Sequence, residues 1–149
     1  MENDKLFELR EYNNLTQRDI GEILGVRQQT YAEWEKGKKI IPLKHLVTLA
    51  KYYNVSLDYL TGLSKKKDIF YKFVTLNKKE IGKRIIYVRS LYNIKQKDLA
   101  NILNTSPSTI CAYEKGNTLI LTVFLYQIAK EYKISIDWLV GASPVVKRH

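Results

Sequence analysis

The sequence contains few of the residues from which disulfides, metal sites and catalytic centres are built. Its 149 residues include one cysteine and two histidines, of which His149 is terminal. A single cysteine excludes an intramolecular disulfide, and one Cys with two His cannot form a structural zinc site. No convergent set of His, Cys and carboxylate residues and no Gly-rich phosphate loop is present. We therefore predict a protein that is not an enzyme and that has no cofactor and no metal site.

Long apolar runs are also missing. No stretch approaches the roughly 18 apolar residues that a membrane-spanning helix needs. The sequence begins with the polar residues Met1-Glu2-Asn3-Asp4-Lys5, which do not form a signal-peptide pattern. We therefore expect a cytoplasmic, nucleoid-associated protein with no membrane segment.

The charge is unevenly distributed along the chain. The 25 Lys and Arg residues against 15 Asp and Glu give a net charge of +10. Residues 1–64 are neutral overall, whereas residues 65–84 hold eight basic and two acidic side chains. A strongly basic balance indicates a polyanionic partner such as nucleic acid. Most of the positive charge lies between two nearly neutral halves.

Those halves are copies of one another. Leu6–Ser64 aligns with Ile85–Ser143 at an offset of 79 without a gap, and the identical pairs include Gln17/Gln96, Glu35/Glu114 and Gly37/Gly116. Self-similarity of this length indicates tandem domains. The sequence predicts a first domain at 1–64, a linker at 65–76, a second domain at 77–143 and a basic tail at 144–149.

Helical spacing of apolar residues predicts an all-α fold with five helices in each domain. In the first domain we expect a helix after an Asn3 cap, then Gln17–Leu24, Gln28–Lys36, a helix after Pro42, and Leu57–Leu60 behind a Ser56 cap. In the second we expect Lys78–Tyr92, with a capping box from Asn77 and Glu80, then Gln96–Leu103, Pro107–Lys115, Val123–Tyr132 and Ile136–Leu139.

The stretch from Thr16 to Gly37 predicts a helix-turn-helix. Thr16 and Asp19 form a capping box at the start of the first helix. Gly25 then supplies the left-handed residue that ends it, and Gly37 ends the second helix in the same way. Two short helices joined by a tight turn are the DNA-binding arrangement of this motif.

The second helix of the motif separates its residues onto two faces. Tyr31 and Trp34 fall on one side and should be buried. The polar side holds Gln28, Gln29, Ala32, Glu33 and Lys36. A Gln side chain can bond bidentately to adenine N6 and N7 in the major groove. This face therefore favours DNA reading over an ordinary solvated helix surface.

The stretch resembles the Cro/repressor, or XRE-type, helix-turn-helix of phage and bacterial regulators. The resemblance is carried by Gln17, Gly21, Gly25, Val26, Tyr31, Trp34, Glu35 and Gly37, and through the repeat it covers both domains. It implies a sequence-specific transcriptional regulator, a repressor, that binds double-stranded DNA. It also implies that Gln17 holds a phosphate, and that the pairs Arg10–Glu35 and Arg89–Glu114 tie the first helix to the third. Arg27 stands where the family often has a serine cap and supplies a phosphate donor instead.

The second domain keeps this frame but changes the outward face. Ser106, Pro107, Ser108, Cys111, Ala112 and Lys115 stand at the positions of Arg27, Gln28, Gln29, Ala32, Glu33 and Lys36. Ser can bond several bases and Ala or Cys can contact a thymine methyl, but none gives bidentate discrimination. We expect this domain to bind DNA with a looser sequence preference, the alternative being a purely structural role. Cys111 is interpreted as a small helix residue.

The full set of predicted DNA-binding residues is Thr16, Gln17, Arg27, Gln28, Gln29, Ala32, Glu33, Lys36, Lys38 and Lys39 in the first domain, and Gln96, Ser106, Pro107, Ser108, Cys111, Ala112, Lys115 and Asn117 in the second.

A second hypothesis is a protein-interaction or antitoxin-like module. The apolar stretch Leu119–Leu125 has more apolar residues than one small domain can bury, and residues 68–76 are too apolar for a flexible tether. Both regions could pack inside the chain, form a homodimer or bind a protein partner. Helix and strand remain open for residues 68–76, and the neighbouring Lys65-Lys66-Lys67 is either a set of phosphate contacts or a solvated charge run.

Overall fold

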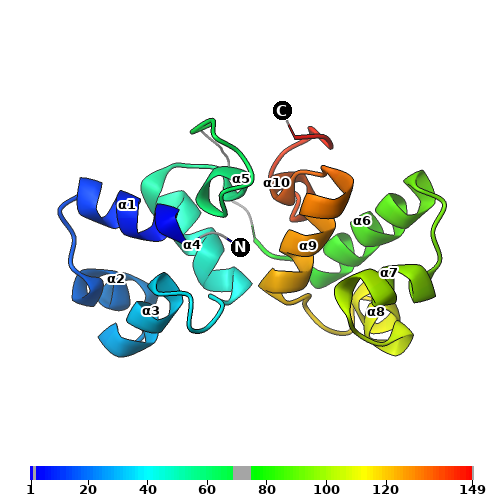
Figure 1. Cartoon of the computed structure of the whole chain (residues 1–149), viewed down its shortest axis with the longest axis horizontal. Coiled ribbons are helices and arrows are strands. Elements are labelled where there is room, and N and C mark those ends of the chain that lie inside the picture. The colour runs from blue at the N-terminus through cyan, green and yellow to red at the C-terminus, as the bar shows by residue number, and fades with distance from the viewer. Residues whose placement is uncertain (2, 69–74, 149) are drawn as a thin grey trace. The chain divides into compact units, whose positions relative to one another are not determined.

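The computed structural model describes residue 1, residues 3–68 and residues 75–148. Within these residues ten α-helices form two compact units of five helices each (Figure 1). The first unit contains α1 (Asp4–Tyr12), α2 (Gln17–Leu24), α3 (Gln28–Glu35), α4 (Leu43–Tyr53) and α5 (Leu57–Leu60). The second contains α6 (Lys78–Leu91), α7 (Gln96–Leu103), α8 (Pro107–Glu114), α9 (Thr122–Tyr132) and α10 (Ile136–Leu139). The predicted all-α fold with five helices per domain is confirmed, with helix ends within one or two residues of those expected.

The two units bury the same positions of the repeat. The first buries Leu6, Leu9, Ile20, Leu24, Tyr31, Trp34, Ile41, Leu46, Leu49 and Leu60, and the second buries the aligned Ile85, Val88, Leu99, Leu103, Ile110, Tyr113, Ile120, Leu125, Ile128 and Leu139. Burial of each such side chain stabilises the fold by about 1.5–3 kcal/mol. The shared apolar pattern thus builds the same five-helix frame twice.

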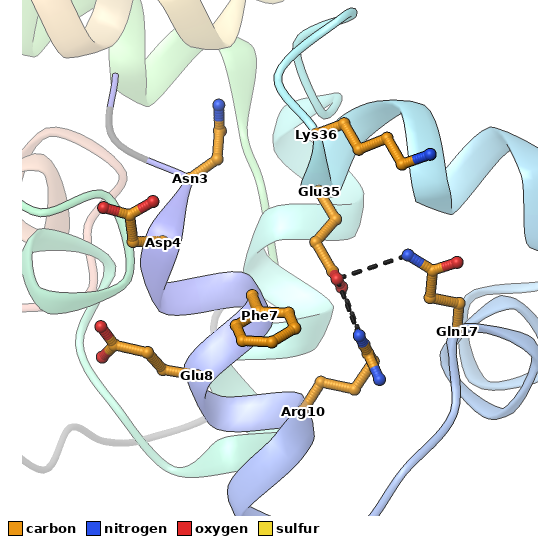
Figure 2. Close-up of a pocket in the computed structure, with 8 residues that line it drawn as sticks. All are labelled: Asn3, Asp4, Phe7, Glu8, Arg10, Gln17, Glu35 and Lys36. Carbon is orange, nitrogen blue, oxygen red and sulfur yellow. Dashed lines mark hydrogen bonds and ion pairs between the residues drawn. The ribbon is translucent and has the colours of Figure 1, made fainter.

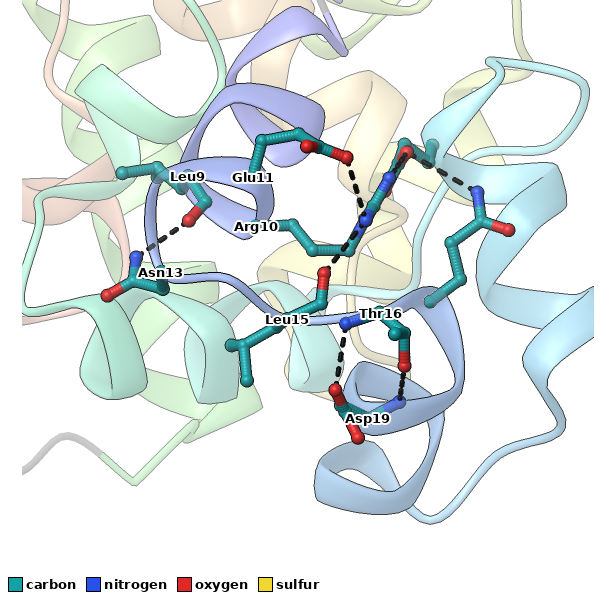
Figure 3. A network of polar contacts seen from close by, with 9 residues as sticks. Leu9, Arg10, Glu11, Asn13, Leu15, Thr16 and Asp19 are labelled. Carbon is teal, nitrogen blue, oxygen red and sulfur yellow. Dashed lines mark hydrogen bonds and ion pairs between the residues drawn. The ribbon is translucent and has the colours of Figure 1, made fainter.

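The start of α2 has the predicted capping box. Thr16 Oγ1 accepts from the Asp19 backbone N–H at 3.0 Å, and Asp19 Oδ2 accepts from the Thr16 N–H at 2.8 Å (Figure 3). Those hydrogen bonds hold the pKa of Asp19 below its usual value. In α7 only half of the box remains. Lys95 N–H donates to Asp98 Oδ2 at 2.9 Å, but a lysine side chain has no acceptor to return the bond.

Left-handed residues end α2 and α7, as predicted. Gly25 has φ +71° and Asn104 has φ +55°. Glycine adopts this conformation without a Cβ penalty, and asparagine tolerates it better than most residues. The turn into the next helix therefore has the same form in both units.

Two predicted helix caps are wrong in detail, although the helices begin where expected. Asn3 precedes α1 but has helical dihedral angles and makes no capping bond; its amide nitrogen lies against the Gly37 turn instead. Asn77 does cap α6, accepting from the N–H groups of Lys79 and Glu80 at 3.0 and 3.1 Å. Glu80 does not complete the box, because its carboxylate pairs with Arg84 at 3.3 Å.

The chain continues to contact each unit after its fifth helix. The Ser56 N–H donates to Asp68 O at 3.0 Å, and the aligned Ser135 N–H donates to Val146 O at 2.8 Å. Lys147 then lies over the Tyr92 ring, with Nζ 5.0 Å from the centroid. Val146 and Lys147 of the predicted tail thus contact the second unit. The conformation expected for residues 69–74 lies outside the described residues.

Candidate nucleic-acid interface

The polar face of α3 is exposed at its amino-terminal end. Gln28 and Gln29 form the first turn and are exposed, while Tyr31 and Trp34 on the opposite side are buried. Arg27 occupies the N-cap position without a side-chain cap bond, as predicted, and its side chain is exposed. Two amides and a guanidinium therefore lie together at one helix end.

Close packing holds α3 against α2. A Cβ on Gly21 would lie 2.8 Å from Val26 O, so any larger residue there would push the turn away. The glycine in α2 thus allows the short approach that sets the direction of α3.

An ion pair fixes the other end of α3. Arg10 Nε and Nη2 donate to the two Glu35 carboxylate oxygens, each at 2.8 Å, and Arg10 Nη1 donates to Leu15 O at 2.9 Å (Figures 2 and 3). The two side chains are only 9% and 6% exposed. Burial raises the pKa of the Glu35 carboxyl, but the Arg10 bonds outweigh this and leave the pKa below its usual value. At neutral pH both groups are therefore ionised, and each is already bound to the other.

The second unit contains the aligned ion pair. Arg89 Nε and Nη2 donate to the Glu114 carboxylate at 2.5 and 2.8 Å, and Nη1 donates to Ile94 O at 3.0 Å. These bonds raise the pKa of Arg89 above its ordinary value. The two pairs expected from the family resemblance are thus present in the structure.

The two glutamines at the starts of α2 and α7 also reach this ion pair. Gln17 Nε2 donates to Glu35 Oε1 at 3.4 Å, and Gln96 Nε2 donates to Glu114 Oε1 at 2.9 Å. Each amide nitrogen has two hydrogens, so one donor remains for another acceptor. The ion pair therefore orients the residue for which a phosphate contact is predicted.

The loop after α3 is basic. Lys39 Nζ pairs with Glu33 at 3.2 Å, which neutralises the one carboxylate on the reading face. Lys36 and Lys38 are exposed, and no carboxylate among the described residues pairs with either of them. Two uncompensated ammonium groups therefore flank the polar face.

The aligned face of α8 is small and largely uncharged. Ser106 caps the helix by accepting from the Thr109 N–H at 3.2 Å, and Pro107 occupies the first helical position, as predicted. The Ser106 hydroxyl also lies 3.0 Å from that of Ser108. Cys111 and Ala112 are half-buried. The hydroxyls at this helix end are thus already engaged with one another.

An apolar hollow adjoins α8. It has a volume of about 450 Å³ and is lined by Ser108, Thr109, Ala112, Tyr113, Thr118, Leu119 and Leu121. Leu119 is 37% and Leu121 56% exposed, whereas Ile120 between them is buried. Part of the Leu119–Leu125 run is thus left uncovered.

Comparison with known proteins agrees with this geometry. A helix-turn-helix profile matches residues 6–60, and a second helix-turn-helix domain profile matches residues 82–141. The chain is 40% identical over 55 residues to an HTH-type transcriptional regulator of Methanocaldococcus jannaschii, of which the match covers 83%. The chain belongs to the helix-turn-helix family of transcriptional regulators.

Two further relatives are longer than the region they share with this regulator. It is 38% identical over 64 residues to the HTH-type transcriptional regulator YobD of Bacillus subtilis, covering 43% of the chain and 57% of the relative. It is 36% identical over 58 residues to the HTH-type transcriptional activator BcrR of Enterococcus faecalis, covering 39% of the chain and 28% of the relative. The chain thus spans about half the length of the first relative and less of the second.

The chain has the predicted tandem XRE-type helix-turn-helix organisation. All eighteen side chains predicted to contact DNA are exposed or half-buried, and they lie on α2, α3 and the next loop, or on the aligned α7, α8 and loop. Their individual roles remain predictions. No helix in the described ranges is long and apolar enough to cross a membrane.

A second hollow lies between α1 and α3 of the regulator. It has a volume of about 620 Å³ and is lined by Asn3, Asp4, Phe7, Glu8, Arg10, Gln17, Glu35 and Lys36 (Figure 2). No cluster of three or more His, Cys, Asp or Glu able to hold a metal ion occurs in the part of the chain that the structure describes. The Arg10–Glu35–Gln17 contacts that line this hollow belong to the ion-pair network.

The sequence did not reveal that the start of α6 lies beside the loop after α8. Lys78 Nζ donates to Asn117 O at 3.4 Å, in the loop directly after α8. The signal in the sequence was the length predicted for α6, which begins earlier than the aligned helix of the first unit. Asp4, the first residue of α1, aligns with Lys83, five residues after the start of α6. A helix that begins early needs something to pack against.

Proposed function

We propose that the first unit reads base pairs by placing α3 in the major groove. The observation that carries this proposal is the exposed pair Gln28 and Gln29 at the start of a helix fixed by Gly21 and by the Arg10–Glu35 ion pair. Each glutamine can bond adenine N6 and N7, and a bidentate contact discriminates against the wrong base by about 1–3 kcal/mol.

The phosphate backbone is held by the groups around that helix. Gln17 offers its remaining amide hydrogen, and Arg27, Lys36 and Lys38 offer exposed charge. Glu33, which would repel phosphate, is neutralised by Lys39. In the second unit Gln96 and Lys115 take the corresponding places. Such contacts position the protein, whereas base contacts specify the site.

The second unit binds DNA with less discrimination. Its helix α8 presents hydroxyl, thiol and methyl groups in place of the two amides, so it can approach closely but has no bidentate partner for a base. If both helices serve one operator, the two half-sites lie about 34 Å apart, one helical turn.

We also propose that the chain represses transcription in the cytoplasm, at the nucleoid, by occupying a promoter. Blocking polymerase needs only tight binding at the right site, whereas activation needs a further contact. A reporter gene placed behind the selected operator should lose expression when the regulator is supplied. Increased expression would instead assign it the role named for the Enterococcus relative.

Substitution of single residues tests the reading helix. Gln28→Ala should weaken binding to the preferred duplex by about 1–3 kcal/mol and relax the preference at one base pair. Lys115→Ala, the comparison variant that removes a predicted phosphate contact, should weaken binding to all duplexes alike and make the salt dependence shallower. Equal losses on preferred and random DNA for Gln28→Ala would contradict its role as a base reader.

A protein-binding role for the second unit is favoured by one observation. Leu119 and Leu121 are exposed beside the hollow at α8. Leu121 aligns with Pro42 of the first unit, whereas Leu119 aligns with Ile40, which is exposed as well. In this alternative the region binds a protein partner or a second copy of the chain. Leu121→Ser should then dissociate a complex seen by light scattering, whereas a wild-type chain that stays monomeric at high concentration counts against the homodimer.

A further inference from the structure

The loop after the reading helix has lost its positive charge in the second unit. Lys38 and Lys39 of the first unit align with Asn117 and Thr118, and the N-cap Arg27 aligns with Ser106. Of the first unit's cations Arg27, Lys36, Lys38 and Lys39, Lys36 alone has a basic counterpart in the second unit, Lys115. A domain that binds DNA with little base discrimination, as proposed above, needs such cations, because contacts to the DNA phosphates supply most of the sequence-independent affinity.

The first turn of α6 lies against the end of α8. A Cβ on Gly82 would lie 2.4 Å from Tyr113 O and 2.6 Å from Glu114 O, so the backbones of the two helices are in direct contact there. The stem of Lys79 packs on the next turn, where a Cβ on Gly116 would lie 2.6 Å from its Cγ. The extra residues of α6 therefore cross the carboxyl-terminal end of the reading helix.

This crossing places the Lys78 ammonium group, and the side-chain stem of Lys79, beside the loop in which the lysines are missing. Lys78 Nζ donates to the carbonyl oxygen of Asn117, the residue that aligns with Lys38. Lys78 and Lys79 are both exposed, and within residues 3–68 and 75–148 no carboxylate pairs with either. The neighbouring Glu80 is taken up by Arg84. The two charges are thus uncompensated.

The backbone amides of the helix start are not the source of this positive site. Asn77 Oδ1 already accepts from the N–H groups of Lys79 and Glu80. An anion near this turn would therefore meet the lysine side chains.

We propose that Lys78 and Lys79 bind phosphates of the DNA strand beside α8, and so replace the loop cations that the first unit uses. The inference rests on the proposed function, since it requires that the second unit lies on DNA. The competing explanation is that the lysines only stabilise the negative end of the α8 dipole.

The test is the salt dependence of binding by the full chain to a duplex selected for it. In the double variant Lys78→Ala/Lys79→Ala the slope of log K against log salt should become shallower by about 1 per lysine. Binding to random duplex should fall by the same factor. Lys78→Arg/Lys79→Arg should keep the wild-type slope, and Lys130→Ala, an exposed lysine in the last turn of α9, should leave it unchanged.

The outcomes separate the two levels of the argument. If the wild-type chain binds the duplex and the double variant keeps the wild-type salt slope, this inference alone is overturned. Lowered thermal stability in that variant would then show that the lysines stabilise the α8 helix end instead. A wild-type chain that binds no duplex would overturn the proposed function and this inference together. Native melting of the variant with a shallower slope supports the phosphate contacts.

Discussion

The two units share one interior and differ on one surface. Ile20 and Leu24 of α2 are buried, as are the aligned Leu99 and Leu103 of α7. The exposed Gln28 and Gln29, by contrast, are replaced by Pro107 and Ser108. Packing restricts a buried position to apolar residues of similar volume, whereas an exposed position is restricted only by what it binds. The contrast therefore separates the residues of the frame from the residues of the interface.

The position of positive charge differs in the same way. Each unit has a lysine at the end of its third helix, Lys36 or Lys115, but the first unit also has Lys38 and Lys39 in the loop that follows. In the second, Lys78 and Lys79 approach from the helix α6. A unit without lysines in this loop can keep its contacts with the DNA phosphates only if another element supplies the positive charge.

The largest expected effect concerns the ion pairs. Glu35→Gln should destabilise the first unit by about 3 kcal/mol, because it removes the buried counter-charge of the Arg10 guanidinium and leaves it with the exposed Glu11 carboxylate. Glu114→Gln should cost the second unit less, since the Arg89 side chain is 19% exposed against 9% for Arg10. Hydrogen exchange resolved by peptide would report each unit separately, and a larger loss in the second unit would contradict this ranking.

The approach of α6 to α8 gives the next comparison. Gly82→Ala places a methyl group against two carbonyl oxygens and should destabilise the second unit by about 1–3 kcal/mol. The aligned Asn3→Ala in the first unit removes no capping bond and should change stability by less than about 0.5 kcal/mol. Urea unfolding measures both, and a tolerated Gly82→Ala would show that the helices can separate freely.

The starts of α2 and α7 differ by one cap. Thr16→Ala should cost about 1 kcal/mol by removing the bond to the Asp19 N–H. Lys95→Thr should supply that missing bond to α7 and stabilise the second unit by up to about 1 kcal/mol. The melting temperature should fall in Thr16→Ala and rise in Lys95→Thr. A loss of stability in Lys95→Thr would mean that Lys95 has another role.

The smallest expected difference is in pH dependence. Burial, helped by the charge of Lys44, lowers the pKa of His45. Between that pKa and the value of about 6.5 in the unfolded chain, the unfolded state binds more protons, so the first unit should lose stability as the pH falls through this window. The aligned residue of the second unit is Phe124, which does not titrate. Hydrogen exchange at pH 7.5 and 5.5 should show the loss in the first unit, and His45→Gln should remove it.

Local chemistry made much of the fold predictable. The Thr16–Asp19 box and the Gly25 turn depend on residues within four positions of one another, so the pattern alone places α2 and its end. The gapless repeat then transfers the same reading to the second unit. Helix ends without such local bonds were less certain, as Asn3 illustrates: its amide lies against Gly37, far along the sequence.

Contacts between distant elements of the interface were not predictable from spacing. The Glu33–Lys39 pair neutralises a carboxylate for which the sequence allowed either a cytosine contact or an intervening partner, and did not identify that partner. The crossing of α6 over α8 depends on how closely two helices approach at Gly82, and a glycine in a helical pattern does not reveal its neighbour. Which surface lysines face DNA is therefore decided by tertiary packing.

The most direct test of the account is selection of bound sequences from a random duplex pool by the full chain at about 150 mM salt, where specific binding outlasts non-specific binding. The account predicts one strongly selected block, read by Gln28 and Gln29, and a weakly selected flank at the second unit. The account would be contradicted if the double variant Gln28→Ala/Gln29→Ala still selected the same block, or if the wild-type chain selected no sequence at all.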